Sequence, residues 1–356
     1  MARVTLQTIA DHVGVSRMTV SNAFSRPDQL SQDLRDRILA AAADLGYAGP
    51  DPAARALARG STGAVGVLLT DVLGEAFTDE VATRFLGAVV EGLAPTGLAL
   101  TLLTTTERED VIPARDVAMD GALLYSCRPE SSAREWLLRR KLPLVFVDQD
   151  PQPGIPSVNV DDRSGAEAAA RHLVELGHRQ VAILTVLLDH PAGISDDPLD
   201  GPWGHPQQQR MRGWLAGLDT AGVRPTVVHV PHNHDAAADE GAERVLALDP
   251  RVTAVLCFSD VLAFGVLRAA RALGLDVPDD LSVVGFDDNP LSRRSEPPLT
   301  TVRQDVVEKG RLAATTLTAA IANARAGTTT RARHHELPTE LVLRATTARA
   351  QSSQTS

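Results

Sequence analysis

The sequence has few cysteines, few aromatic side chains and no long hydrophobic segment. Its 356 residues include 2 cysteines and only 3% Phe, Trp and Tyr. Cys127 and Cys257 stand far apart in apolar runs, which predicts two buried free thiols rather than a disulfide or a metal site. No segment approaches the roughly 18–20 uninterrupted apolar residues of a membrane span. Since the first residues also lack an apolar signal region, we expect a cytoplasmic protein that does not bind membranes.

The signatures of common enzymes are missing as well. The sequence contains no glycine-rich phosphate loop after a strand, no nucleophile elbow and no cysteine–histidine constellation. His229, His232 and His234 lie with Asp235 around Pro231, at a predicted strand end where alternation would scatter their side chains. We therefore expect neither an enzyme nor a bound metal or cofactor.

Charge is distributed unevenly along the chain. The net charge is −10 at pH 7, but residues 1–62 carry seven Lys and Arg against six Asp and Glu, and the remainder carries 28 against 39. An acidic remainder discourages nonspecific coating of nucleic acid, whereas the nearly neutral N-terminal part can approach phosphates. Any contact with nucleic acid is therefore expected in the first 62 residues.

The first 25 residues have the pattern of two short helices joined by a tight turn. Thr5 and Ser16 can cap helices over 5–13 and 16–24, and Gly14 can form the turn between them. This pattern predicts a helix-turn-helix, in which the start of the second helix enters the major groove of DNA. The residues at that start are Arg17 and Met18, with Asn22 one turn later.

Two more helices are expected before the pattern changes at Gly63. One covers 31–45 and ends at Gly46. The other, over 51–59, is capped by Asp51 and is too short to persist without a partner.

Short apolar runs then alternate with amphipathic stretches. The runs are 64–69, 98–103, 122–125, 142–147, 181–184, 226–230, 253–258 and 281–286, and the helical stretches are 163–176, 207–221, 236–248, 261–273 and 305–324. This alternation predicts two consecutive α/β lobes with parallel sheets. Residues 189–206 are expected to form an irregular loop and the polar tail after 346 to be disordered.

Five stretches together resemble the lac repressor/galactose repressor (LacI/GalR) family of transcription factors. They are 5–22, 54–57, 158–162 with 172–178, 282–288 and 298–302. The resemblance covers nearly the whole chain. It implies an N-terminal all-α helix-turn-helix domain, a hinge helix, and an α/β periplasmic-binding-protein-like core of two doubly wound parallel-sheet lobes. The expected boundaries are 1–48 for the reader, 49–62 for the hinge and linker, 63–160 with 291–326 for the N-terminal lobe, 161–290 with 327–346 for the C-terminal lobe, and 347–356 for the tail.

The resemblance further implies a ligand-responsive repressor that binds a pseudo-palindromic DNA operator as a homodimer. Arg17 and Asn22 take base-reading positions, where a bidentate pair contributes about 1–3 kcal/mol of discrimination. Leu57 matches the hinge leucine that wedges into the minor groove. The implied DNA-binding set is Thr5, Ser16, Arg17, Met18, Thr19, Asn22, Tyr47, Ala54 and Leu57.

A small-molecule effector is expected between the lobes, at the carboxyl ends of strands. Several polar residues follow predicted strands, and Arg210 and Phe77 match the family's ligand-binding arginine and stacking aromatic. The predicted effector-binding set is Asp71, Phe77, Asp148, Arg210, Ser259, Asp260 and Asp287. The resemblance implies a small sugar or sugar derivative, with nucleosides, purines and other metabolites as alternatives.

Two other functions stay open on the sequence. An activator or global regulator of the same fold would answer a protein partner, and a solute-binding protein would share the two lobes. The helix-turn-helix domain and the missing secretion signal argue against a solute-binding protein. Binding of a small sugar between the two lobes would distinguish the expected repressor from an activator or global regulator that answers a protein partner.

Overall fold

The computed structural model describes residues 4–49, 51–69, 77, 79–104, 111–128, 130–188, 190–195, 197–199, 203–328 and 330–351. The chain divides into two compact units, Met1–Gly63 and Ala64–Ser356. Within the described ranges, every helix falls short of the length and apolarity needed to span a lipid bilayer. Both cysteines are buried thiols that form no disulfide with each other, as expected.

The first unit is helical. Its helices are α1 (Leu6–Val13), α2 (Arg17–Ser25), η1 (Pro27–Gln29), α3 (Gln32–Asp44) and α4 (Pro52–Arg59). Thr5 caps α1, Ser16 Oγ accepts from the Thr19 amide at 3.0 Å to cap α2, and Gly14 makes the turn at φ 78°. A small core joins α1, α2 and α3, formed by Ile9, Ala10, Val20, Ala23, Ile38, Ala41 and Ala42. The predicted helix-turn-helix is confirmed.

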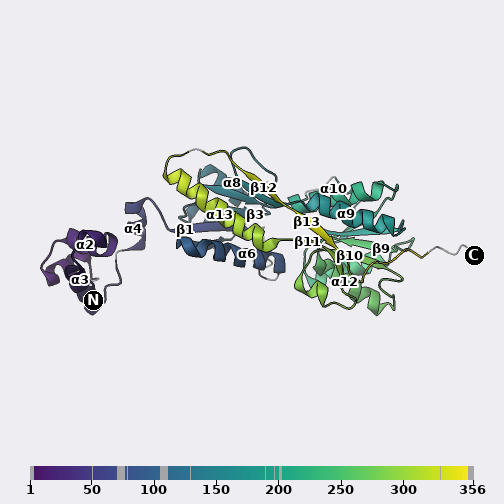
Figure 1. Ribbon diagram of the computed structural model, residues 1–356, viewed down its shortest axis with the longest axis horizontal. Coiled ribbons are helices and arrows are strands. Elements are labelled where there is room, and N and C mark those ends of the chain that lie inside the picture. Colours follow the sequence, from purple (N-terminus) through teal and green to yellow (C-terminus); the bar gives the residue numbers. More distant parts are fainter. Residues whose placement is uncertain are drawn as a thin grey trace, which may run out of the picture. The chain divides into compact units, whose positions relative to one another are not determined.

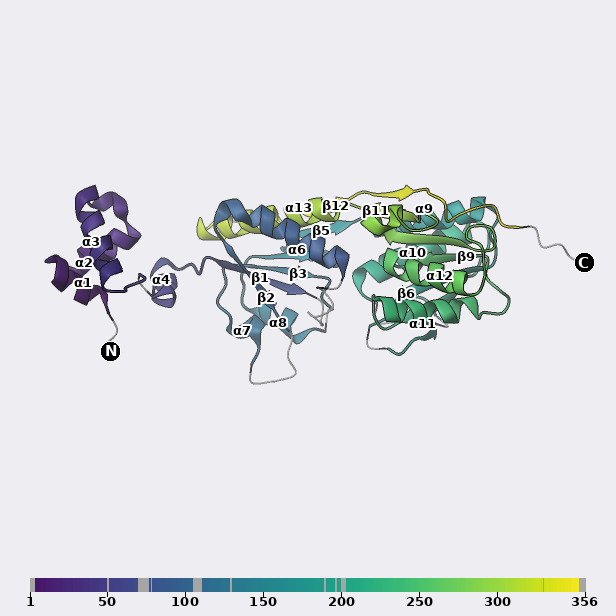
Figure 2. The same cartoon turned by 90° about the horizontal axis from the view of Figure 1, so that it is seen from below.

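The first lobe of the second unit is a parallel sheet covered on both faces. Its strands are β1 (Ala64–Leu69), β2 (Ala99–Leu103), β3 (Ala122–Tyr125), β4 (Leu144–Val147), β5 (Ser157–Val160) and β12 (His334–Leu337), in the order β12-β5-β4-β3-β1-β2. Its helices are α6 (Glu80–Leu93), η2 (Ala94–Thr96), α7 (Pro113–Asp116), α8 (Ser132–Arg139) and α13 (Val306–Arg325). α6 and α13 cover one face, and α7 and α8 cover the other (Figure 2).

The second lobe has the same layering (Figure 1). Its strands are β6 (Val181–Val186), β7 (Gly193–Ser195), β8 (Thr226–Val230), β9 (Ala254–Cys257), β10 (Ser282–Asp287), β11 (Thr300–Gln304) and β13 (Thr339–Val342), in the order β13-β11-β10-β9-β6-β8-β7. Its helices are α9 (Asp162–Glu175), α10 (His205–Asp219), α11 (Asp235–Leu246), α12 (Asp260–Ala272) and η3 (Pro290–Arg293). Only the edge strands β7 and β13 pair antiparallel among the described strands.

Two of the predicted lobe boundaries are wrong. β11, predicted in the N-terminal lobe with 291–326, pairs with β10 in the second sheet. β12, predicted in the C-terminal lobe with 327–346, pairs with β5 in the first sheet. Apolar runs identify strands, but partner choice depends on contacts across the sheet that the local pattern does not contain.

Two segments are more regular than predicted. β7 lies inside 189–206 and pairs with β8. In the expected tail, Thr347 Oγ1 lies 3.0 Å from His172 Nε2, and the Ala348 amide donates to Ser282 Oγ at 3.1 Å. These bonds fix residues 347–351 against the second lobe, and residues 352–356 lie outside the described chain. Polar composition alone therefore predicted too much disorder.

Candidate functional site

The start of α2 presents the predicted base-reading residues. Arg17 and Met18 are exposed, Met18 by 69%. Asn22 is half-buried, and its Nδ2 donates to Gln29 Oε1 at 3.2 Å. Arg17 and Met18 are therefore exposed as the predicted base contacts require, whereas the predicted contact of Asn22 would require its side chain to leave Gln29.

Three further residues of the predicted DNA-binding set, Thr5, Ser16 and Thr19, lie at helix starts, and a fourth, Tyr47, follows α3. Ser16 Oγ and Thr19 Oγ1 lie 2.8 Å apart at the start of α2, and Thr5 caps α1. Tyr47 packs edge-on against Phe24 with 5.7 Å between ring centroids. Helix N-termini carry partial positive charge and free amides, so hydroxyls there can share a phosphate with the backbone.

The short helix α4 presents an exposed leucine. Leu57 is 87% exposed, the largest fraction among the exposed large apolar residues of the described chain, and Ala54 is exposed on the same helix. Asp51 Oδ1 accepts from the Ala54 amide at 3.3 Å, so the predicted cap is confirmed. Dependence of α4 on a partner stays a prediction, since eight residues are marginal for a helix in water.

In the second unit, a cavity of about 160 Å³ opens at the carboxyl ends of strands from both lobes. Three of the predicted effector residues line it, namely Asp148, Arg210 and Asp287. Ser126, Asp148 and Asp287, all in its lining, have positive φ values of 49°, 51° and 109°. Non-glycine residues held in this region are strained and concentrate at binding sites.

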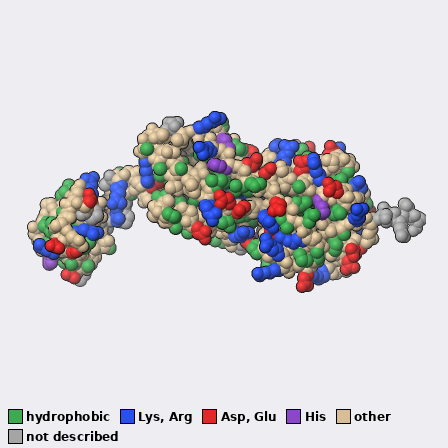
Figure 3. Space-filling model, in the orientation of Figure 1, with side chains coloured by type: hydrophobic (Ala, Val, Ile, Leu, Met, Phe, Trp, Pro, Cys, Tyr) green, Lys and Arg blue, Asp and Glu red, His purple; other side chains and the backbone are tan. Residues whose placement is uncertain are grey.

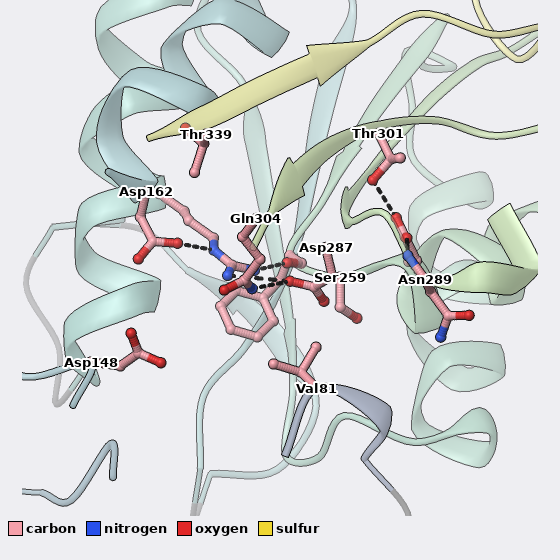
Figure 4. Close-up of polar contacts among 12 residues, drawn as sticks. Val81, Asp148, Asp162, Ser259, Asp287, Asn289, Thr301, Gln304 and Thr339 are labelled. Atoms are coloured by element: carbon pink, nitrogen blue, oxygen red, sulfur yellow. Dashed lines mark hydrogen bonds and ion pairs between the residues drawn. The ribbon is translucent and has the colours of Figure 1, made fainter. Parts of the chain in front are cut away.

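Arg210 is held rigidly in the wall of this cavity. Helices α10 and α9 approach closely at Gly213, where a Cβ would lie 2.2 Å from the Arg163 carbonyl oxygen, so the absence of a side chain permits this approach. Arg210 Nε then donates to Asp162 Oδ1 at 2.8 Å and Nη2 to Asp287 Oδ1 at 3.4 Å. Nη1 donates to the Phe258 carbonyl. Figure 4 shows Asp162 and Asp287 on either side of these bonds.

The pKa values of Arg210 and Asp287 follow from their burial and from the charges beside them. Burial disfavours the Arg210 cation, but the carboxylates of Asp162 and Asp287 outweigh it and raise the pKa of Arg210. Burial raises the pKa of Asp287 to about 8, against the opposing influence of Arg210. Gln304 Nε2 also donates to Asp287 Oδ1 at 2.7 Å. Arg210 is therefore a permanent, fully engaged cation.

Sequence reasoning missed a second buried cation, Lys309. Its Nζ lies 2.6 Å from Asp148 Oδ2 and 3.0 Å from Gln304 Oε1, and the residue is 1% exposed. The signal was present, because Lys309 falls three residues after Val306 and four before Ala313, on the apolar stripe of α13. A lysine on such a stripe requires a buried partner.

Three of the predicted residues do not reach the lining, and a fourth lies outside the described residues. Ser259 Oγ caps α12 and donates to Asn233 Oδ1 at 2.6 Å, and Asn233 does line the cavity. Asp260 accepts from three donors in the chain that follows β10, which are the Asn289 amide, Ser292 Oγ and Thr301 Oγ1 at 2.7, 2.6 and 2.5 Å. Phe77 is 56% exposed and outside the lining, and Asp71 lies outside the described residues. Ser259 and Asp260 thus hold supporting positions.

Asp260 predicts a pH dependence of stability. Burial raises its pKa to about 7 from an ordinary value of 3.8. A raised carboxyl pKa stabilises the folded state fully below about pH 4, and this contribution is lost as pH rises towards 7, by at most about 1.4 kcal/mol per pH unit. In urea denaturation, the unfolding free energy of wild type minus that of Asp260→Asn is expected to decrease as pH rises from 4 to 7. A pH-independent difference would contradict the assignment.

Figure 3 shows side chains of both charges interspersed over the visible face of the second unit.

The chain matches known families in both units. Residues 5–49 match the bacterial regulatory proteins of the lacI family, and residues 170–347 match a periplasmic binding protein-like domain. Both matches agree with the helix-turn-helix and with the two-sheet core.

Relatives and solved structures agree with this assignment. An HTH-type transcriptional regulator of Mycolicibacterium smegmatis is 37% identical over 328 residues, 87% of this chain and 89% of that protein. The lac repressor dimer bound to operator and the anti-inducer ONPF has a TM-score of 0.76 and 25% identity, covering 98% of this chain and 100% of that one. The CelR–cellobiose complex has a TM-score of 0.69 and 25% identity, covering 97% and 100%. The chain therefore belongs to the lacI family of bacterial regulatory proteins and is a transcriptional regulator, not an enzyme.

Proposed function

We propose that this protein is a cytoplasmic, ligand-responsive repressor that binds a pseudo-palindromic operator as a homodimer. Residues 1–48 read the operator, residues 49–62 form the hinge, and a small sugar-like effector binds in the cleft. The operator-bound lac repressor dimer supports the first part by similarity, and the CelR–cellobiose complex supports the effector class.

One observation carries the choice of a small polar effector over a protein partner. Asp148 Oδ1 and Gln207 Oε1 are buried in the lining and have no hydrogen-bond partner within the described chain. Leaving a buried acceptor unsatisfied costs about 1–3 kcal/mol. A small hydroxylated molecule can satisfy both atoms inside a cavity of about 160 Å³, which no protein segment of ordinary bulk can enter fully.

Ligand and DNA are coupled through the crossovers between the lobes. The chain passes between the two sheets from β5 to α9, from β11 to α13 and from β12 to β13. Closure of the lobes on an effector changes the geometry of these crossovers and hence the spacing of the two hinge segments in a dimer. An inducer must bind the DNA-incompetent arrangement more tightly, and the ratio of its two affinities limits the response.

The proposal is tested on the full-length protein with DNA fragments selected by binding. We expect the selected fragments to share a symmetric site, and a neutral sugar from a panel to change the affinity for that site. The affinity is measured by fluorescence anisotropy of labelled DNA. An unsymmetrical consensus would contradict the homodimer, and an affinity unmoved by every small molecule would favour a protein partner.

Asp287 separates effector response from DNA binding. Asp287→Ala removes the acceptor shared by Arg210 and Gln304, so we expect at least a roughly tenfold weaker effector response with little change in effector-free operator affinity. The same anisotropy assay measures both quantities. Asp287→Asn, whose side chain tolerates the positive φ, is the control for folding. If both variants fail to fold, Asp287 has a structural role instead.

A further inference from the structure

Lys309 is one of only two lysines in the sequence, the other being Lys141. It enters the cavity from α13, is 1% exposed, and donates to Asp148 and Gln304. Because a buried ammonium ion is stable only with compensating partners, this lysine and the Asp148 carboxylate depend on each other.

Lys309 is part of a continuous polar chain across the cavity. From Lys309 the contacts run to Gln304, from Gln304 Nε2 to Asp287, and from Asp287 to Arg210. Figure 4 shows Gln304 and Asp287 together at the centre, with Asp148 standing apart. Both buried cations of the lining, Lys309 and Arg210, are thus already matched by carboxylates.

A third cation of the lining, Arg128, is likewise not without a partner. Every buried cation in the described part of the lining therefore already has a partner and is not available to an incoming anion. The cavity offers instead the carboxylates of Asp79 and Asp148. A phosphate or carboxylate group placed beside them is destabilised by like charge in a medium that screens it weakly.

The two lining atoms that lack hydrogen-bond partners favour a ligand that donates hydrogen bonds. Asp148 is 4% exposed and Gln207 is 9% exposed, and the atoms without partners, Asp148 Oδ1 and Gln207 Oε1, are both acceptors. Lys309 donates to the other oxygen of this carboxylate, Asp148 Oδ2, and carboxylate oxygens accept hydrogen bonds. A ligand hydroxyl can donate to Asp148 Oδ1, whereas a carboxylate or a fully ionised phosphate cannot.

We propose that Lys309 is a specificity-determining residue of the cleft: paired with Asp148, it selects a neutral polyhydroxylated ligand and rejects the phosphorylated or carboxylated form of the same sugar. The inference rests on the proposed function and deepens it by naming the ligand class. Its basis is the pairing of both buried cations together with the two acceptors that lack partners.

The direct test compares matched sugars on the full-length protein by titration calorimetry. The probes are glucose, galactose and ribose, the 6-phosphates and uronic acids of the two hexoses, and ribose 5-phosphate. At least one neutral sugar is expected to bind on the order of 100-fold more tightly than its charged forms. Tighter binding of a charged form would overturn this inference and leave the sugar-responsive regulator standing. Silence of every sugar would overturn both.

Variants then assign the selectivity to Lys309. Lys309→Met is expected to weaken the neutral sugar on the order of 100-fold, because Asp148 loses its counter-ion, and Lys309→Arg is expected to restore part of the affinity. Lys141→Met, at an exposed position outside the lining, is the matched control and is expected to bind like wild type. Unchanged sugar affinity in a folded Lys309→Met variant would overturn the assignment.

A measurement on the unaltered protein covers the case in which Lys309→Met does not fold. Labelling lysine Nζ with ¹⁵N gives at most one side-chain signal for each of the two lysines. Saturation with the bound neutral sugar is expected to shift the Lys309 signal and leave Lys141 unaffected. A Lys309 signal that does not move at saturation would show that the ligand binds away from this residue.

Discussion

Leu57→Ala is expected to lower operator affinity by on the order of 30-fold while effector affinity stays unchanged. Leu57 is 87% exposed in the single chain, so the apolar surface that a minor-groove wedge would bury is available. Burying a leucine side chain contributes about 2 kcal/mol, which corresponds to this factor. Fluorescence anisotropy with operator DNA measures the first affinity, and calorimetry with the effector measures the second.

Leu343→Ala is the matched control for this prediction. Leu343 is also an exposed leucine, by 58%, but it lies after β13 in the second unit. Its removal is expected to leave operator affinity within about twofold of wild type, as for most surface substitutions. If Leu57→Ala binds the operator as tightly as Leu343→Ala does, the wedge role of Leu57 is wrong.

Arg210→Met is expected to destabilise the second unit by about 3–5 kcal/mol and to abolish the effector response. The substitution leaves Asp162 and Asp287, 1% and 7% exposed, without their shared cation. An uncompensated buried carboxylate is far more costly than a lost neutral hydrogen bond. Urea denaturation, followed by the fluorescence of buried Trp214 in this unit, reports the stability.

Two variants sharpen the interpretation of Arg210→Met. Arg212→Met removes an exposed arginine from the same helix and is expected to cost less than about 0.5 kcal/mol. Arg210→Met combined with Asp162→Leu removes a carboxylate together with the cation, and we expect it to recover part of the lost stability. Equal stability of Arg210→Met and Arg212→Met would mean that the cluster does not need the guanidinium.

Much of the fold could be predicted because its signals are local. The helix-turn-helix is specified by Thr5, Ser16 and Gly14, which cap and turn within a few residues of the helices they define. Strands β1–β4, β6 and β8–β10 read as short apolar runs, and helices α9–α13 read by their period. The buried strands β5 and β11 and the helices α6 and α8 were not predicted. The sheets of β11 and β12 were predicted wrongly, because sheet membership depends on pairing between residues distant in sequence.

Arg210 was predicted from the family resemblance, and the residue pattern itself predicted the site only where a strand end determines it. Asp148 and Asp287 directly follow β4 and end β10, and parallel strands open at one edge of their sheet. Ser259 and Asp260 also follow a strand, yet both turn to cap α12 or to hold the chain after β10. The apolar stripe of α13 indicated that Lys309 is buried, but its place in the lining depends on how α13 packs, which the stripe does not report.

Footprinting of one selected operator by the intact chain and by a chain lacking residues 1–62 tests the central claim most directly. We propose that the first unit recognises DNA and that the cleft of the second controls this recognition, and the two units are separately compact. The intact chain is therefore expected to protect the operator, the bound sugar to change this protection, and the shortened chain to protect nothing. Equal protection by the shortened chain would contradict this proposal.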